Sequence, residues 1–228
     1  MLVINTKFRI SHAPVSTFNL RPVMMILAMM FGGAIATTGC SSERSKTYLP
    51  VKSTVVALGD SLTYGYGASP DSNYPSVLAD LTNWNVINKG LNGNTSADVL
   101  ARVDKVIALK PDLVLFGVGG NDVLRRVQSG TTATNITETI RQLKAADIEV
   151  ILIAEPYFSA SALFGRASDN PIYKQIADSQ NVPLYSKRWS EVISNDSLKS
   201  DQIHPNAAGY RYFAEGLYEY LQDEGWVK

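Results

Sequence analysis

The chain has 228 residues, of which 21 are lysine or arginine and 21 are aspartate or glutamate, so its formal net charge is zero. Such a balance offers no basic patch for nucleic acid. A single cysteine, Cys40, excludes an internal disulfide and a cysteine-ligated zinc site, and two histidines, His12 and His204, exclude a site built from several histidine ligands. We therefore expect a protein without a bound metal or cofactor.

Residues 1–39 predict a secretory leader that is removed from the mature protein. They carry Lys7, Arg9 and Arg21 but no acidic residue, and an apolar run from Val23 to Ala36 follows. A helix that spans a membrane needs about 20 apolar residues, so this shorter run does not predict a permanent transmembrane anchor. Removal of the leader leaves 18 basic against 21 acidic residues, a net charge of −3. His204 is then the only histidine.

The end of this leader resembles a bacterial lipobox. Small residues, Thr37-Thr38-Gly39, precede Cys40, whose thiol in such a motif is lipidated and becomes the new N-terminus. The alternative is an ordinary signal peptide with Cys40 incidental. Residues 40–52 are then a polar tether. A serine rather than an aspartate after Cys40 favours the outer membrane of the cell envelope, with the protein facing the periplasm.

Short β-branched apolar runs alternate with helical patterns along residues 53–228, which predict one domain. The runs predict strands over 54–58, 86–87, 113–118 and 150–153, and over 182–185, where Pro183 indicates a sheet edge or a strand start. Apolar residues at helical spacing predict helices over 74–81, 96–109, 135–146, 171–179 and 207–221. This alternation predicts an α/β fold, a three-layer α/β/α sandwich around a mostly parallel five-stranded sheet.

Polar loops follow the first three predicted strands. They are Gly59-Asp60-Ser61, residues 88–95, and Gly119-Gly120-Asn121-Asp122. Ligands bind beyond the carboxyl ends of parallel strands, so these loops should share one edge of the sheet. The segment Asp201–His204 has to reach that edge from the far end of the chain.

The residue types in these loops suit nucleophilic catalysis by serine. Ser61 needs an adjacent base to take its proton, and His204 is the base that the mature chain provides. Asp201 lies three residues before His204, a spacing that allows it to orient the imidazole. The alternative is that Gly-Asp-Ser is an ordinary strand-to-helix turn in which Ser61 caps the helix.

An oxyanion would also need donors. The candidates are the backbone N–H groups of Ser61 and Gly93 and the side-chain amide of Asn121. Taken singly, the glycine is an ordinary turn former and the asparagine an ordinary cap. Asp60 and Asp122 are expected to brace their loops, Asp122 on behalf of Asn121.

Taken together, these blocks resemble the GDSL/SGNH hydrolases. Gly59-Asp60-Ser61-Leu62, Gly93 in Asn92-Gly93-Asn94-Thr95, Gly119-Gly120-Asn121-Asp122 and Asp201-Gln202-Ile203-His204-Pro205 match the four blocks of that family in order. The resemblance extends from about residue 53 to the C-terminus and is closest to the bacterial arylesterase and thioesterase I–lysophospholipase branch. It implies a flavodoxin-like fold, Ser61 as nucleophile, Asp201 and His204 as the rest of a triad, and Ser61, Gly93 and Asn121 as oxyanion donors.

The implied function is a serine esterase that acts on a small acyl ester, a thioester or a lysophospholipid. The alternatives are a carbohydrate O-acetyl esterase acting on an envelope polysaccharide and a non-catalytic lipoprotein that binds ligands on the same scaffold. The long connection 154–170 is a candidate binding loop. Aromatic and aliphatic residues near the active edge either line an acyl pocket or pack as core or lid: Tyr64, Tyr66, Tyr157, Phe158, Leu163 and Phe164.

Overall fold

The computed structural model describes residues 48–158 and 166–228. The predicted leader, Cys40, most of the tether and the pocket candidates Leu163 and Phe164 lie outside the described residues. Within them, no helix is both long and apolar enough to cross a membrane.

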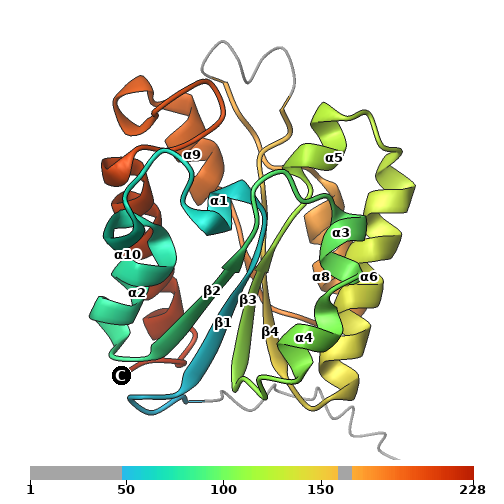
Figure 1. The fold of residues 1–228 in the computed structure, drawn as a ribbon, viewed down its shortest axis with the longest axis vertical. Coiled ribbons are helices and arrows are strands. Elements are labelled where there is room, and N and C mark those ends of the chain that lie inside the picture. The colour runs from blue at the N-terminus through green and yellow to red at the C-terminus, as the bar shows by residue number, and fades with distance from the viewer. Residues whose placement is uncertain (1–47, 159–165) are drawn as a thin grey trace, which may run out of the picture. The chain divides into compact units, whose positions relative to one another are not determined.

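A parallel sheet forms the centre of the domain (Figure 1). Its strands are β1 (Thr54–Gly59), β2 (Asn85–Gly90), β3 (Leu113–Gly117), β4 (Glu149–Ile153) and β5 (Leu184–Tyr185). They are ordered β2-β1-β3-β4-β5, and every pairing is parallel, with Val55 opposite both Val86 and Leu113. The predicted five-stranded sheet is therefore confirmed, and its weakest strand, β5, lies at an edge as Pro183 indicated.

Alternate residues of each strand enter two separate cores. Val55 and Ala57 pack beneath α2 (Tyr74–Thr82), α9 (Arg188–Ser194) and α10 (Ala207–Asp223). Val56 and Leu58 pack on the other face beneath α3 (Ser96–Leu100), α4 (Val103–Ile107), α6 (Ser129–Ala145) and α8 (Ile172–Gln180). Figure 1 shows these two groups of helices on opposite sides of the sheet. The predicted three-layer sandwich is thus confirmed.

Aromatic rings fill the first of these cores. The rings of Trp189 and Phe213 stack with their centroids 3.6 Å apart, and Tyr74 meets Phe213 edge-on at 4.9 Å. All three side chains are buried. Each buried side chain of this size contributes about 1.5–3 kcal/mol of transfer free energy, so this packing stabilises α2, α9 and α10 against the sheet.

The predicted helix over 96–109 is wrong as a single helix. The chain leaves helical geometry at Arg102, with φ −124° and ψ 9°. The guanidinium of Arg102 donates to Asn94 Oδ1 at 2.9 Å and to the carbonyl of Gly59 at 2.8 Å. Those bonds hold Arg102 against two loops at the active edge of the sheet. The helical spacing of apolar residues continues across this break because α3 and α4 pack on the same core.

Several short helices were not predicted. Two of them, α1 (Ser61–Tyr64) and α5 (Gly120–Leu124), begin directly after β1 and β3. A further pair of single-turn 3₁₀ segments lies at Pro70–Ser72 and Asp196–Leu198. The helix α6 also begins earlier than predicted, at Ser129, because its first turns are polar and carry no apolar period.

Candidate active site

The predicted nucleophile, base and acid are brought together at the carboxyl edge of the sheet. Ser61 is the first residue of α1, and its Oγ lies 3.0 Å from Nε2 of His204. The other ring nitrogen of His204, Nδ1, lies 2.8 Å from Oδ2 of Asp201. The three side chains therefore form one continuous hydrogen-bonded chain, although 143 residues separate Ser61 from His204.

Asp201 is held in its ionised form. Partial burial would raise the pKa of its carboxyl group, but the His204 side chain and the backbone N–H groups of Ile203 and His204 outweigh it and lower the pKa. An ionised carboxylate only accepts hydrogen bonds, so Nδ1 of His204 donates to Asp201. Nε2 is then free to accept from the hydroxyl of Ser61, which is the tautomer that a general base requires.

The loop that carries His204 is closed by its own hydrogen bonds. The backbone N–H of Ser200 donates to the carbonyl of His204 at 2.9 Å, and Ser200 Oγ donates to the carbonyl of Pro205 at 3.0 Å. Gly67, with φ +89°, packs against this loop so closely that a Cβ there would lie 2.1 Å from Ser200 Oγ. The loop between α1 and α2 thus fixes the position of the imidazole.

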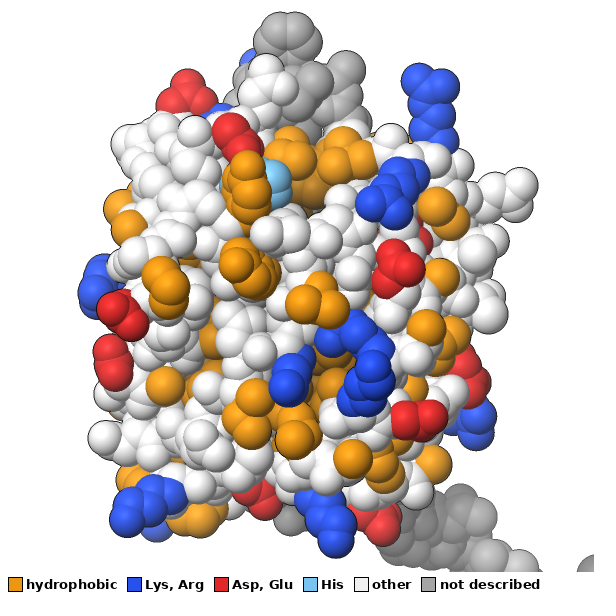
Figure 2. All heavy atoms as spheres, in the orientation of Figure 1, with side chains coloured by type: hydrophobic (Ala, Val, Ile, Leu, Met, Phe, Trp, Pro, Cys, Tyr) orange, Lys and Arg blue, Asp and Glu red, His pale blue; other side chains and the backbone are white. Residues whose placement is uncertain are grey.

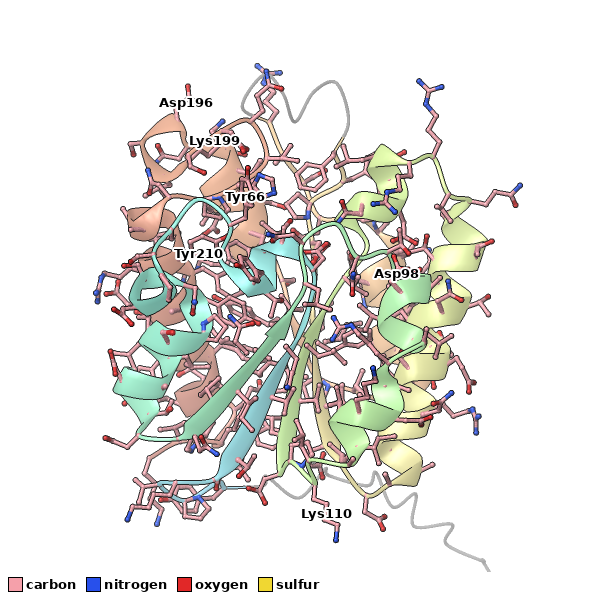
Figure 3. All side chains as sticks on the ribbon, in the orientation of Figure 1. Tyr66, Asp98, Lys110, Asp196, Lys199 and Tyr210 are labelled. Atoms are coloured by element: carbon pink, nitrogen blue, oxygen red, sulfur yellow. The ribbon has the colours of Figure 1, made fainter. Side chains whose placement is uncertain are left out.

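The ring of Tyr66 packs against that imidazole. Its ring centroid lies 4.4 Å from that of His204, with the planes inclined by 42°. The backbone carbonyl of Tyr66 accepts a 2.9 Å hydrogen bond from the hydroxyl of Tyr210 in α10 (Figure 3). Tyr66 was predicted as a pocket, core or lid residue, and the structure places it against the base.

The candidate oxyanion donors lie on the three predicted loops. In the described residues, the backbone N–H groups of Ser61 and Gly93 donate to no other residue, and Gly93 has a φ of +75° that favours glycine. The Asn121 amide, in contrast, has both of its hydrogens engaged. Its Nδ2 donates to Oδ2 of Asp60 at 3.2 Å and to the carbonyl of Asn94 at 3.1 Å.

The two aspartates expected to brace the loops do so differently. Asp60 accepts from the backbone N–H of Leu62 at 3.0 Å and from Asn121, so it braces α1 and the amide together. Asp122 does not brace Asn121. Its carboxylate accepts from the backbone N–H and hydroxyl of Ser96 and from the hydroxyl of Thr132, which ties α3 and α6 to α5.

Glu155 is a further buried acid at the site, and the sequence interpretation missed it. It follows β4 and is 1 % exposed, and its Oε2 accepts from the backbone N–H of Gly120 at 2.7 Å. The signal available in the sequence was its place: an acid shortly after a buried strand, in a sheet whose strands β1 and β3 are also followed by site residues.

Apolar side chains surround the reacting groups. A small hollow of about 10 Å³ at Ser61 is lined by Leu124, Phe158 and Ile203 together with Asn121 and His204. In Figure 2 a histidine side chain, coloured pale blue, lies at the surface beside orange apolar side chains. Of the other predicted pocket residues, Tyr64 lines a neighbouring hollow of about 450 Å³ with Leu91, and Tyr157 is exposed.

Comparison with known sequences identifies the family of the chain. Residues 57–212 match the model of the GDSL-like Lipase/Acylhydrolase family. The chain is 31% identical over 176 residues to thioesterase 1/protease 1/lysophospholipase L1 of Escherichia coli K12, covering 74% of this chain and 83% of that protein. It is 28% identical over 163 residues to an acetylxylan esterase of Geobacillus stearothermophilus, covering 63% and 74%.

A solved structure shares the fold. The psychrotrophic esterase EstA from Pseudoalteromonas sp., in a structure inhibited by monoethylphosphonate, superposes with a TM-score of 0.64. The match covers 75% of this chain and 97% of that chain at 24% sequence identity.

Proposed function

Because the chain belongs to the GDSL-like lipase/acylhydrolase family and is an ester-hydrolysing enzyme, we propose that Ser61, His204 and Asp201 are its catalytic triad. The observation that carries the proposal is the unbroken chain of hydrogen bonds from Ser61 Oγ through both ring nitrogens of His204 to Asp201. A serine that only caps a helix does not require a hydrogen bond between its hydroxyl and an imidazole.

The reaction proceeds in two halves. Ser61 Oγ attacks the carbonyl carbon of the ester while Nε2 of His204 takes the hydroxyl proton, and Asp201 stabilises the imidazolium that forms. His204 returns the proton to the departing alcohol or thiol. Water then attacks the carbonyl carbon of the acyl group on Ser61 while Nε2 of His204 takes a proton from it. His204 passes this proton to Ser61 Oγ as the bond to the acyl group breaks and the acid leaves. No cofactor enters this sequence.

The tetrahedral intermediate carries its negative charge on the former carbonyl oxygen. We assign its stabilisation to the backbone N–H groups of Ser61 and Gly93 and to the amide of Asn121. The first two are unengaged in the described residues. Asn121 contributes when its hydrogen bond to Asp60, which at 3.2 Å is the longer of its two bonds, is shared with or given up to the oxyanion.

The favoured substrate is a small ester of an apolar acyl chain, with thioesters and lysophospholipids as chemically related candidates. Leu124, Phe158 and Ile203 around Ser61 support an apolar acyl group, and the 31% identical relative is named a thioesterase and lysophospholipase. The second candidate is a sugar O-acetyl ester, which the similarity to an acetylxylan esterase favours.

A series of p-nitrophenyl esters of rising acyl length, run beside acetylated xylo-oligosaccharides, tests this proposal. We expect kcat/KM to rise from acetyl to longer acyl chains and Ser61→Ala to abolish turnover without unfolding the protein. A preference for the acetylated sugars would favour the second candidate. Activity that survives in Ser61→Ala would overturn the triad, and the absence of turnover on any ester would favour a non-catalytic scaffold.

We further propose that the protein is anchored to the outer membrane by a lipid on Cys40 and faces the periplasm. The support is the lipobox-like Thr37-Thr38-Gly39-Cys40, the serine that follows it, and a polar tether.

A further inference from the structure

Three acidic side chains are buried after strands that end at the active edge of the sheet. Asp60, Asp122 and Glu155 are 2 %, 1 % and 1 % exposed, and they follow β1, β3 and β4. Buried carboxylates are costly unless donors surround them. Asp122 is supplied with donors by Ser96 and Thr132, whereas the triad chemistry explains neither Asp60 nor Glu155.

The donors around Asp60 and Glu155 are fewer. Asp60 receives one backbone N–H, from Leu62, and the amide of Asn121. Glu155 receives one backbone N–H, from Gly120. Glu155 lowers the pKa of Asp60, and the charge of Asp60 raises the pKa of Glu155, so the two carboxyl groups are close neighbours. Ionised carboxylates are acceptors only, so a hydrogen bond between them requires a proton on one of the pair.

We propose that Glu155 is a positioning residue that shares one proton with Asp60, and that this proton limits the charge of the pair beneath the oxyanion donors to one negative unit. Oε2 of Glu155 accepts from Gly120, so the other oxygen carries the proton and donates it to Asp60. The effect on catalysis rests on the proposed function. The shared proton itself does not depend on that function.

The electrostatics of the site favour one proton over none. Burial raises the pKa of both carboxyl groups, that of Asp60 to about 7, and the neighbouring charge of Asp122 raises both further. The phenol groups that face the pair, Tyr74 from α2 and Tyr173 from α8, have pKa values raised by burial and stay neutral.

Other charged and titratable groups lie at the edges of the pair. The phenol of Tyr210, from α10, also has a pKa raised by burial and stays neutral. The guanidinium of Arg102 reaches the Gly59 carbonyl, next to Asp60 in the chain, but its charge also faces Asp98. His204 is one hydrogen bond beyond Ser61. Of these groups, only Arg102 carries a permanent positive charge.

The pair contacts the oxyanion donors from two sides. Asp60 holds the amide of Asn121, and Glu155 holds the backbone of Gly120, the residue before Asn121. Loss of the shared proton would place a second negative charge beside groups that must stabilise a developing oxyanion. It would also strengthen the hydrogen bond that the Asn121 amide donates to Asp60. Both effects oppose the transition state more than substrate binding, so they should lower kcat rather than raise KM.

The test compares Glu155→Gln with Glu155→Ala. Glutamine has an N–H₂ group that donates permanently to Asp60 and a carbonyl that accepts from Gly120, so it imitates the protonated acid. We expect E155A to lower kcat roughly tenfold or more and E155Q to restore it to within about threefold of the wild type at neutral pH. Above neutral pH, kcat of the wild type should fall while that of E155Q stays level. Glu149→Gln, at the exposed opposite end of β4, is the matched control and should change nothing.

Two further readouts do not require activity. Infrared spectra of the wild type at neutral pH should contain the carbonyl band of a protonated carboxylic acid that E155Q lacks. The folded protein keeps this proton over a pH range in which the unfolded chain has lost it. Above about pH 5, the free energy of unfolding of the wild type should therefore fall more steeply with rising pH than that of E155Q.

The outcomes separate this inference from the proposed function. Absence of the infrared difference, or identical pH profiles for the wild type and E155Q, would overturn the shared proton even if hydrolysis depends on Ser61. If no ester is hydrolysed, the proposed function fails, and the infrared and unfolding measurements still decide about the proton.

Discussion

At the scale of single residues, the site depends on one imidazole. His204 accepts from Ser61 and donates to Asp201, and Tyr66 packs on its face. The sequence predicted that these three residues meet because their types suit serine catalysis when taken together and because the four blocks in order resemble a known family. It did not predict the contact of Tyr66 or the role of Glu155, because neither follows from local spacing; each is set by how a loop or strand end packs in three dimensions.

The single imidazole leads to a sharp prediction for His204→Ala. Because the described residues hold no second histidine, kcat for a p-nitrophenyl ester should fall by about 10⁴-fold or more. Asp201→Asn should also cost up to about 10⁴-fold, because an amide cannot hold Nδ1 of His204 as the donor. Steady-state kinetics on both variants, with circular dichroism to check the fold, would measure this. A His204→Ala variant that kept a tenth of its activity would contradict the role of His204.

At the scale of elements, the long helices and the strands could be predicted and the short helices could not. Apolar periodicity needs several turns to be recognised, and α1 and α5 are one turn each. The break at Arg102 is invisible to periodicity as well, because it is caused by hydrogen bonds from its guanidinium to two distant loops. The functional elements are thus the ones that sequence patterns describe least well.

Gly119 illustrates how closely such a short element is constrained. It precedes α5 with φ +143°, and a Cβ there would lie 2.5 Å from the hydroxyl oxygen of Tyr173. Gly119→Ala should therefore lower the free energy of unfolding by about 1–3 kcal/mol, and it should reduce kcat by displacing Asn121.

Gly130, in the first turn of α6, is the matched control because nothing lies within 4 Å of a Cβ there. Gly130→Ala should leave kcat unchanged and raise the free energy of unfolding by up to about 1 kcal/mol. Urea unfolding of both variants is the measurement. Equal changes in the free energy of unfolding of the two variants would show that the close contact at Gly119 does not affect stability.

At the scale of the whole molecule, the strand order explains why residues far apart in sequence meet. In the order β2-β1-β3-β4-β5, the chain reverses direction across the sheet between β1 and β3. Loops after those two strands diverge to opposite faces and leave a crevice at their carboxyl ends, where ligands bind in such sheets. Ser61 follows β1 and Asn121 follows β3. The sequence predicted a parallel sheet and therefore a shared edge, and the family resemblance supplied the flavodoxin-like order.

The same geometry places the start of the described domain at the end of the sheet opposite the active site. The described domain begins beside its own C-terminus, where the backbone N–H of Leu49 donates to the carbonyl of Trp226 at 3.0 Å, and it enters β1 at the amino end of the sheet. The reacting groups lie at the carboxyl end. A tether that joins the domain at residue 48 therefore attaches at the edge of the sheet opposite the site.

Anchoring should for this reason affect where the enzyme is and leave its chemistry unchanged. Cys40→Ser, expressed from the full-length gene, should move the protein from the membrane pellet to the soluble fraction, with kcat on a soluble p-nitrophenyl ester unchanged. Ser41→Asp is the companion variant: the lipid should remain, and sucrose-gradient fractionation should find the protein in the inner rather than the outer membrane. Wild-type and Cys40→Ser proteins that fractionate alike would refute lipidation, and the leader would then be an ordinary signal peptide.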